Sequence, residues 1–268
     1  DVTEDVVDEA IKKGCNIIIA HHPLLFKGYK SITGKDYIER CIIKVIKNDI
    51  VIYAAHTNLD NAWGGVNHKI AEKLGLIDAK PLAPKTEMLN KLVTFVPKDK
   101  SEEVRQALFD AGCGHIGNYD SCSYNIDGQG SFRALEGANP YCGTINKLHL
   151  EAEVRIETVF PKYLKSKVVK ALLDAHPYEE VAFDIYDLEN TWNQIGAGLI
   201  ANLPEAADEK EFLLKLKETF GVGCVKHSRF RGKPLRKVAL CGGSGGFLLS
   251  NAIQAEADIF ISAEIKYP

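Results

Sequence analysis

Two short histidine motifs are the residues of this sequence best suited to chemistry. His21 and His22 stand directly before Pro23, and the segment HTNLD places His56 four residues before Asp60. Imidazole nitrogen combined with carboxylate oxygen is a ligand set that suits zinc, manganese or iron. The motifs therefore indicate metal-assisted chemistry, in which a bound ion polarises an oxygen or activates water.

Both motifs follow predicted strands. Residues 16–20 (NIIIA) and 50–55 (IVIYAA) are apolar runs typical of strands that are buried on both faces of a parallel sheet. A helical pattern over residues 38–47 predicts the crossover between them. Because neighbouring parallel strands end at the same edge of a sheet, we expect three histidines and one carboxylate to meet there. The alternative that these histidines only cap or hydrogen-bond the strand ends stays open.

The pattern of predicted helices and strands changes at two points along the chain. Residues 1–89 and 191–268 alternate helical and strand patterns, which predicts an α/β core with a mostly parallel sheet and flanking helices. Residues 90–190 predict a separate α+β insert of the ferredoxin-like type. The elements expected in the insert are strands at 91–97, 148–159 and 181–186, helices at 101–111 and 163–175, and a Gly-, Asn- and Ser-rich loop over 112–143.

A glycine-rich segment, GGSGG at residues 242–246, lies between a predicted strand at 237–241 and a predicted helix at 247–255. Free backbone N–H groups before a helix favour anions, so Gly243, Ser244 and Gly245 are candidate substrate- or anion-binding residues. The segment lacks the lysine and the spacing of a P-loop. A tight turn from strand to helix explains it equally well.

Composition excludes several classes of protein. The 268 residues contain 33 Lys+Arg and 36 Asp+Glu, for a formal net charge of −3, and 46% are hydrophobic, as in ordinary globular proteins. Nucleic-acid binding by phosphate neutralisation needs a more basic chain. No apolar run approaches the ~20 residues of a membrane span. Seven cysteines without a C-x-x-C pair predict a reducing, cytoplasmic location.

Several motifs together resemble the Nif-three-like family, whose members are also called GTP cyclohydrolase I type-two homologues. They are HHPLLF at residues 21–26, SIT at 31–33 and HTNLD at 56–60, and the similarity covers essentially the whole chain, the glycine segment included. Within the insert, GNYDSCS at 117–123 and HPYEE at 176–180 resemble the PII-like module of the family's longer members.

The resemblance implies a dinuclear metal centre, with two divalent ions (zinc, iron or manganese) in each subunit. His21, His22 and Asp60 match the family's ligands, and His56 would lie beside them as a further contact or as a catalytic proton carrier. The family also has a His and a Glu four residues apart near its C-terminus, a pair this chain lacks. The chain starts at Asp1 without a methionine and stops at Pro268, so we expect residues to be missing at both ends.

Two functions fit these expectations. The first is a metal-dependent hydrolase that acts on a phosphate- or nucleotide-like small molecule. The alternative is a non-catalytic regulatory protein whose PII-like insert senses a small effector or a protein partner. The resemblance further implies a homohexamer, which nothing in the hydrophobic periodicity reveals.

Overall fold

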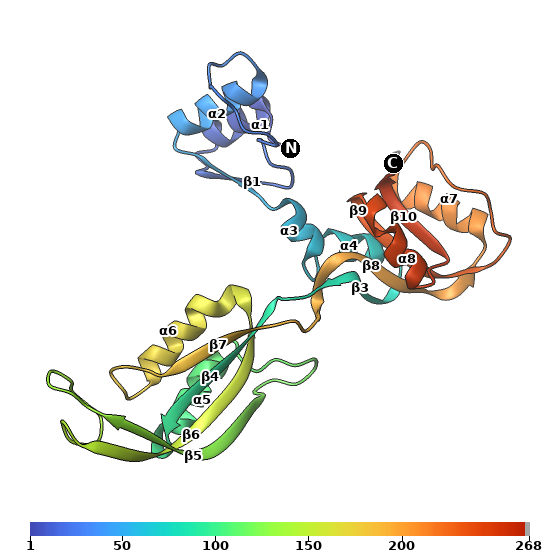
Figure 1. The fold of residues 1–268 in the computed structure, drawn as a ribbon. Coiled ribbons are helices and arrows are strands. Elements are labelled where there is room, and N and C mark those ends of the chain that lie inside the picture. Colours follow the sequence, from blue (N-terminus) through green and yellow to red (C-terminus); the bar gives the residue numbers. More distant parts are fainter. Residues whose placement is uncertain (266–268) are drawn as a thin grey trace. The chain divides into compact units, whose positions relative to one another are not determined.

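The computed structural model describes residues 1–265 and separates into two compact units. One unit comprises Asp1–Pro84 and the chain from Asn193 onward, and the other comprises Lys85–Trp192 (Figure 1). Residues 266–268, where the family resemblance leads us to expect a histidine after Tyr267, lie outside the described part. Among residues 1–265, no helix combines the length and apolar character that a membrane span requires.

The first part of the first unit contains the predicted strand–helix–strand segment. Its elements are α1 (Glu4–Lys12), β1 (Ile17–Ala20), α2 (Tyr37–Lys47) and β2 (Val51–Ala54). The two strands pair in parallel, and Ile18 lies opposite Ile52. The helices contribute Val7, Cys41 and Val45 to a core that also contains Ile18. At the start of α2, the Asp36 carboxylate accepts a hydrogen bond of 2.8 Å from the backbone N–H of Glu39.

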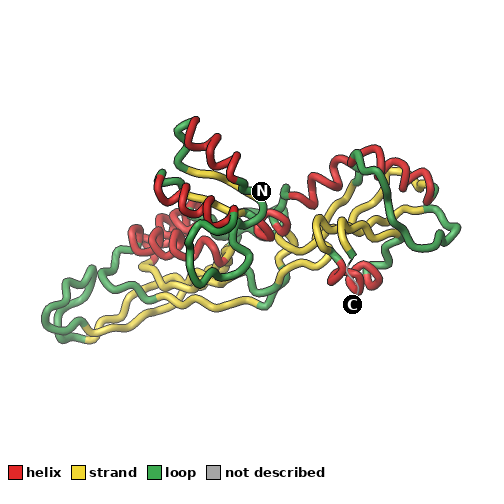
Figure 2. Tube along the Cα trace, turned by 90° about the horizontal axis from the view of Figure 1, so that it is seen from above, coloured by secondary structure: helices red, strands yellow, loops and turns green. Residues whose placement is uncertain are grey.

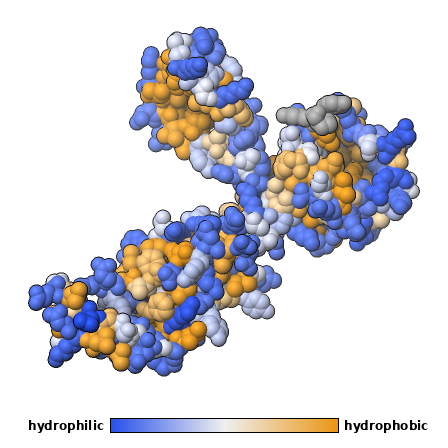
Figure 3. All heavy atoms as spheres, viewed as in Figure 1, coloured by the Kyte–Doolittle hydropathy of each residue, from blue (hydrophilic) through white to orange (hydrophobic). Residues whose placement is uncertain are grey.

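Only one face of this two-stranded sheet is buried in the described structure, so the prediction of burial on both faces is wrong there. Ile17 and Ile19 are 48% and 74% exposed, and the side chains of Val51 and Tyr53 are exposed as well. The cluster that α1 and α2 form takes Ile18 from the other face of the strand. Apolar atoms are accordingly visible at the surface of this part of the chain (Figure 3).

The rest of the first unit surrounds a four-stranded sheet in the order β10-β9-β8-β3. Its strands are β3 (Ile77–Lys85), β8 (Trp192–Ala207), β9 (Leu235–Ser244) and β10 (Ile259–Glu264), and its helices are α3 (His56–Asn61), α4 (Val66–Lys73), α7 (Glu209–Phe220), η3 (Gly246–Leu248) and α8 (Leu249–Gln254). β9 and β10 are parallel, but β8 runs antiparallel to β9. The core is therefore mixed α/β with several sheets, and the prediction of a mostly parallel sheet is confirmed only in part, because the sheets are partly antiparallel.

The apolar pattern of the sequence predicts no strand over residues 192–207, yet β8 is sixteen residues long. Its middle is rich in small residues, which weakens the hydrophobic signal. Gly196 shows why a small residue stands there, because a Cβ at this position would lie 2.5 Å from the carbonyl oxygen of Ala83. Glycine inside a strand often marks such a close approach of another backbone.

The second unit is built from β-α-β-β-α-β elements. They are β4 (Leu89–Pro97), η1 (Lys98–Lys100), α5 (Ser101–Asp110), β5 (Ser123–Arg133), β6 (Leu148–Pro161), η2 (Lys162–Leu164), α6 (Lys165–Ala175) and β7 (Phe183–Leu188). The sheet order is β5-β6-β4-β7, with antiparallel neighbours. α5 and α6 share one core with β4 and β6, including Leu108, Leu172, Leu92 and Ile156. Strands and helices of this unit form two layers (Figure 2).

β5 corrects the loop expected over residues 112–143. The strand lies at the edge of the sheet and pairs only with β6 among the described strands, from Ser123↔Thr158 to Arg133↔Leu148. Most of its side chains are exposed. An edge strand with so little burial carries no alternation of apolar and polar residues, which is why its composition resembles that of a loop.

Candidate metal centre

The candidate ligands lie where β1 and β2 end. The parallel pairing continues past the strands, because the backbone N–H of Ala55 donates to Ala20 O at 2.9 Å and that of His56 donates to His21 O at 2.8 Å. The rings consequently gather: the centroid of His21 is 4.8 Å from that of His22, and His56 is 5.8 Å from each. The structure thus brings the three predicted histidines together.

Asp60 joins this group because it lies one helical turn after His56 on α3. Its Oδ1 atom is 3.5 Å from Nε2 of His21, and both side chains are partly buried. The other ring nitrogen of His21, Nδ1, is buried and has no hydrogen-bond partner among the described residues. A buried nitrogen without a partner is costly, and an ion or a proton donor at this place would satisfy it.

His56 adopts a backbone conformation that non-glycine residues rarely occupy. Its φ angle is +35°, at the point where β2 turns into α3. Phe26 packs edge-on against the imidazole, with ring centroids 5.8 Å apart and an interplanar angle of 89°. Strained residues of this kind persist only where the surrounding structure holds them, and they cluster at functional sites.

Asn67 ties this helix to the larger sheet and was not indicated by any motif. Its amide Nδ2 donates to Asp60 O at 2.8 Å, while its Oδ1 accepts from the backbone N–H of Gly242 at 2.7 Å. The side chain is only 2% exposed. Next to Gly242, burial and the nearby charge of Asp60 raise the pKa of the Cys241 thiol. The end of β9 therefore contributes to the surroundings of Asp60.

The glycine segment differs from its expected form. Gly243 and Ser244 belong to β9, and the N–H of Gly245 donates to Ser262 Oγ at 2.9 Å. The helix that follows, α8, has six residues and comes after a 3-10 turn. The expected row of free N–H groups is thus partly engaged, and an anion-binding role for Gly243, Ser244 and Gly245 stays a prediction.

Two carboxylates hold the segment that contains the histidine pair. Asp1 Oδ1 lies 2.6 Å from Nδ1 of His22. Glu39 has no exposed surface, and its Oε2 accepts hydrogen bonds of 2.8–3.1 Å from the backbone N–H groups of Thr33, Gly34 and Lys35. Burial alone would raise the pKa of Glu39, but these bonds outweigh it and lower the pKa to about 2.

The donor set fits divalent transition metals better than it fits magnesium or calcium, because it is rich in imidazole. The donor atoms of His21, His22 and Asp60 do not all lie within 4.8 Å of one another. The two divalent ions expected in each subunit therefore stay a prediction.

The sheets and their connecting helices define a mixed α/β protein, with candidate metal ligands at the ends of two parallel strands. The DUF34/NIF3 (NGG1p interacting factor 3) family matches residues 1–268, and the chain belongs to this family. It is 44% identical over 268 residues to the "GTP cyclohydrolase 1 type 2 homolog" of Bacillus subtilis (strain 168), covering the whole chain and 72% of that protein.

Solved structures show the same relationship. The chain is similar to a Bacillus cereus protein related to NIF3, with 45% identity and a TM-score of 0.85, over the whole chain and 71% of that protein. It is also similar to Staphylococcus aureus protein SA1388, with 30% identity and a TM-score of 0.68, over the whole chain and 70% of that protein. The family predicted from the histidine motifs is confirmed.

Proposed function

We propose that this chain is a metal-dependent hydrolase that acts on a phosphate- or nucleotide-like small molecule. One observation carries the proposal: His21, His22, His56 and Asp60 converge at the ends of β1 and β2, and a buried nitrogen of His21 has no partner among residues 1–265. The name of the Bacillus subtilis relative, a GTP cyclohydrolase 1 type 2 homolog, supports a nucleotide-like substrate.

The residues present would divide the work as follows. His21, His22 and Asp60 would hold two divalent ions, which supply Lewis-acid polarisation of a phosphoryl or carbonyl oxygen when bound. His56 moves the proton through a ring nitrogen, since imidazole exchanges protons near neutral pH. The backbone hydrogen bond to His21 O holds the main chain of His56, and Phe26 packs against its ring, which together help to position the imidazole for proton transfer.

The proposal extends to the second unit and to assembly. The β-α-β-β-α-β order and antiparallel sheet support a ferredoxin-like unit, for which we propose the PII-like module implied by the motifs. A cytoplasmic location and a homohexamer stay predictions, and sedimentation of the purified chain would measure the second.

A second candidate function is favoured by a cavity of about 700 Å³ in the second unit. Aromatic side chains line it together with charged ones, among them Phe95, Tyr141, Glu153 and Arg155. Pockets of this size that combine apolar walls with a few polar groups commonly bind small ligands. This observation favours a regulatory role, in which the second unit binds an effector and the metal centre is not catalytic.

Elemental analysis and activity profiling of the same purified chain would test the first function. We expect wild-type protein to contain divalent metal and to hydrolyse at least one phosphoester or nucleotide. Asp60→Asn should lower both the metal content and the turnover, whereas Asp5→Asn, an exposed carboxylate on α1, should change neither. Metal that stays bound without any turnover, combined with metal-independent ligand binding by residues 85–192, would contradict the hydrolase and support the second candidate.

A further inference from the structure

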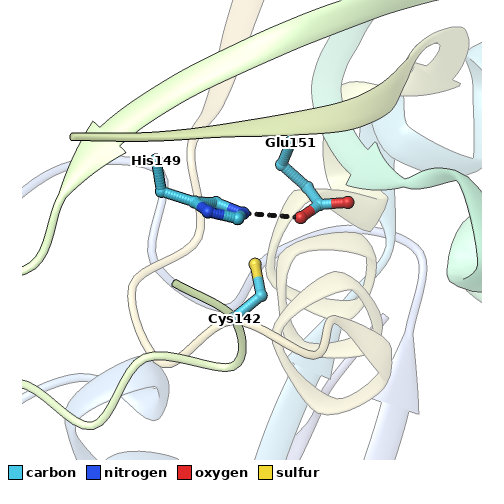
Figure 4. Close-up of side chains that lie close together, drawn as sticks. All are labelled: Cys142, His149 and Glu151. Carbon is cyan, nitrogen blue, oxygen red and sulfur yellow. Dashed lines mark hydrogen bonds and ion pairs between the residues drawn. The ribbon is translucent and has the colours of Figure 1, made fainter. Parts of the chain in front are cut away.

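The second unit contains a cluster of potential metal ligands that is separate from the histidine motifs. Cys142, His149 and Glu151 place one sulfur, one nitrogen and one oxygen atom all within 4.8 Å of one another (Figure 4). His149 and Glu151 are two residues apart on β6, so they project from the same face of that strand. Nε2 of His149 lies 2.8 Å from Oε2 of Glu151.

The loop between β5 and β6 brings Cys142 onto this pair. The backbone N–H of Asn146 closes the loop by donating to Ala134 O at 2.7 Å. Gly143 has a φ angle of +85°, and a Cβ there would lie 3.1 Å from both Cβ and Cγ of His149. Glycine therefore lets the loop lie closely against the imidazole, and the loop brings the neighbouring Cys142 thiol close to it.

The surroundings of the cluster restrict its side chains. Phe132 pairs with His149 across the strands, and the two ring centroids are 5.3 Å apart. The next carboxylate on the same face of β6, Glu153, accepts a hydrogen bond of 2.8 Å from the Tyr178 hydroxyl. Cys142, His149 and Glu151 are each partly buried. Rotamers limited in this way reduce the entropy lost when an ion is bound.

We propose that Cys142, His149 and Glu151 bind one zinc ion. Thiolate and imidazole together select zinc over magnesium and calcium, which prefer oxygen ligands. Three protein ligands suffice for a tetrahedral zinc site that keeps its fourth position for water or another ligand. An isolated ion pair between His149 and Glu151 would require neither the thiol nor the glycine beside it. The site stands independently of the function proposed for the first unit.

Cobalt(II) provides a direct spectroscopic test on the full chain. A thiolate ligand gives cobalt a sulfur-to-metal charge-transfer band in the near ultraviolet, and the candidate ligands of the first unit include no cysteine. We expect the band in the wild-type protein and in Asp60→Asn. Cys142→Ser should abolish it, while Cys122→Ser, another partly buried cysteine of the same unit, should retain it.

Competition with a chromophoric zinc chelator measures the affinity. We expect His149→Gln and Cys142→Ser each to weaken zinc binding about 100-fold, at the upper end of the losses seen even for outer-shell residues. Circular dichroism shows whether each variant is folded. If Cys142→Ser does not fold, the zinc affinity of His149→Gln tests the proposal. A wild-type protein without the cobalt band, a band that survives Cys142→Ser, or unchanged zinc affinity in His149→Gln would overturn the proposal.

Discussion

The backbone N–H of His56 donates a hydrogen bond of 2.8 Å to the carbonyl oxygen of His21. This bond lies beyond the last pair of β1 and β2, Ala20↔Ala54, so the chain stays in parallel register while both histidines leave the strands. The relative position of the two residues is therefore set by the main chain. A change of either side chain should leave this geometry in place, which makes the site well suited to substitution.

His56→Asn separates the role of the imidazole from the strain of its backbone. Asparagine tolerates a positive φ better than most residues, so the variant should keep the +35° conformation. If His56 carries a proton, kcat should fall by about 10²–10⁴-fold while the metal content stays unchanged. Steady-state kinetics and elemental analysis of the same preparation measure both quantities. His115→Asn, at an exposed position, serves as the control, and an unaltered kcat in His56→Asn would exclude the proton-transfer role.

Asn67→Ala should destabilise the first unit by about 1–3 kcal/mol. The substitution leaves the partly buried Gly242 N–H and Asp60 carbonyl without their side-chain partner. Asn48→Ala is the matched control, because Asn48 Nδ2 also donates to a main-chain carbonyl, that of Lys44, but on an exposed side chain. Urea unfolding monitors both variants. If the two variants lose the same free energy of unfolding, burial of the Asn67 hydrogen bonds adds no stability.

Glu39 should stabilise the protein in a pH-dependent way. Its pKa in the folded state is about 2, below the ordinary value of 4.5, so its contribution is complete above about pH 4.5 and is lost as the pH falls towards 2. We expect Glu39→Gln to be less stable than the wild type at pH 7 and the difference to shrink in acid. Chemical unfolding between pH 7 and pH 3 would show this, with exposed Glu211→Gln as the control. A difference that does not vary with pH would contradict the assignment.

His176 should destabilise the second unit when it is protonated. Burial lowers its pKa, although the hydrogen bond to Phe95 O opposes this effect. Nδ1 accepts from the N–H of Tyr178 at 3.1 Å, so the neutral ring donates through Nε2 to Phe95 O at 3.0 Å. Both partners therefore favour one neutral tautomer in the folded unit.

Because the folded pKa of His176 is lowered, its contribution is present above about pH 6.5 and is lost as the pH falls below that value. Between pH 7 and pH 5, the free energy of unfolding of the wild type should fall more steeply than that of His176→Gln, by up to about 1.4 kcal/mol per pH unit. Unfolding curves at each pH give the slopes. His115→Gln should follow the wild type, and parallel slopes for His176→Gln would refute the prediction.

The strands before the histidine motifs were predictable because Ile17–Ala20 and Val51–Ala54 belong to continuous apolar runs that are rich in isoleucine and valine. Their exposed face was not predictable, since an apolar run carries no record of what covers it. β5 and β8 escaped detection for different reasons. β5 has an exposed edge position, and β8 has glycines where β3 approaches closely. The spacing of apolar residues in a sequence reveals a strand only where its side chains are buried in a regular pattern, and these two strands lack one.

The histidine group was predictable because parallel pairing alone brings neighbouring strand ends together. Asn67 and Cys241 were not, because their closeness to Asp60 depends on the turn between α3 and α4 and on where β9 ends. The Cys142 cluster has no recognisable spacing either. Its thiol reaches His149 and Glu151 only through the fold of a fourteen-residue loop between Arg133 and Leu148.

The pairing of β4 with β7 has a consequence for the insertion of the second unit into the gene. Leu89 lies opposite Leu188, so the entry and exit strands of the second unit run side by side, and β3 and β8 are neighbours in the other sheet. A stretch of DNA encoding residues 85–192 could therefore have entered at one point of an ancestral gene and could be removed again. A short hairpin joining β3 to β8 would restore a continuous chain. Shorter relatives built in this way would carry the histidine motifs without the cysteine cluster.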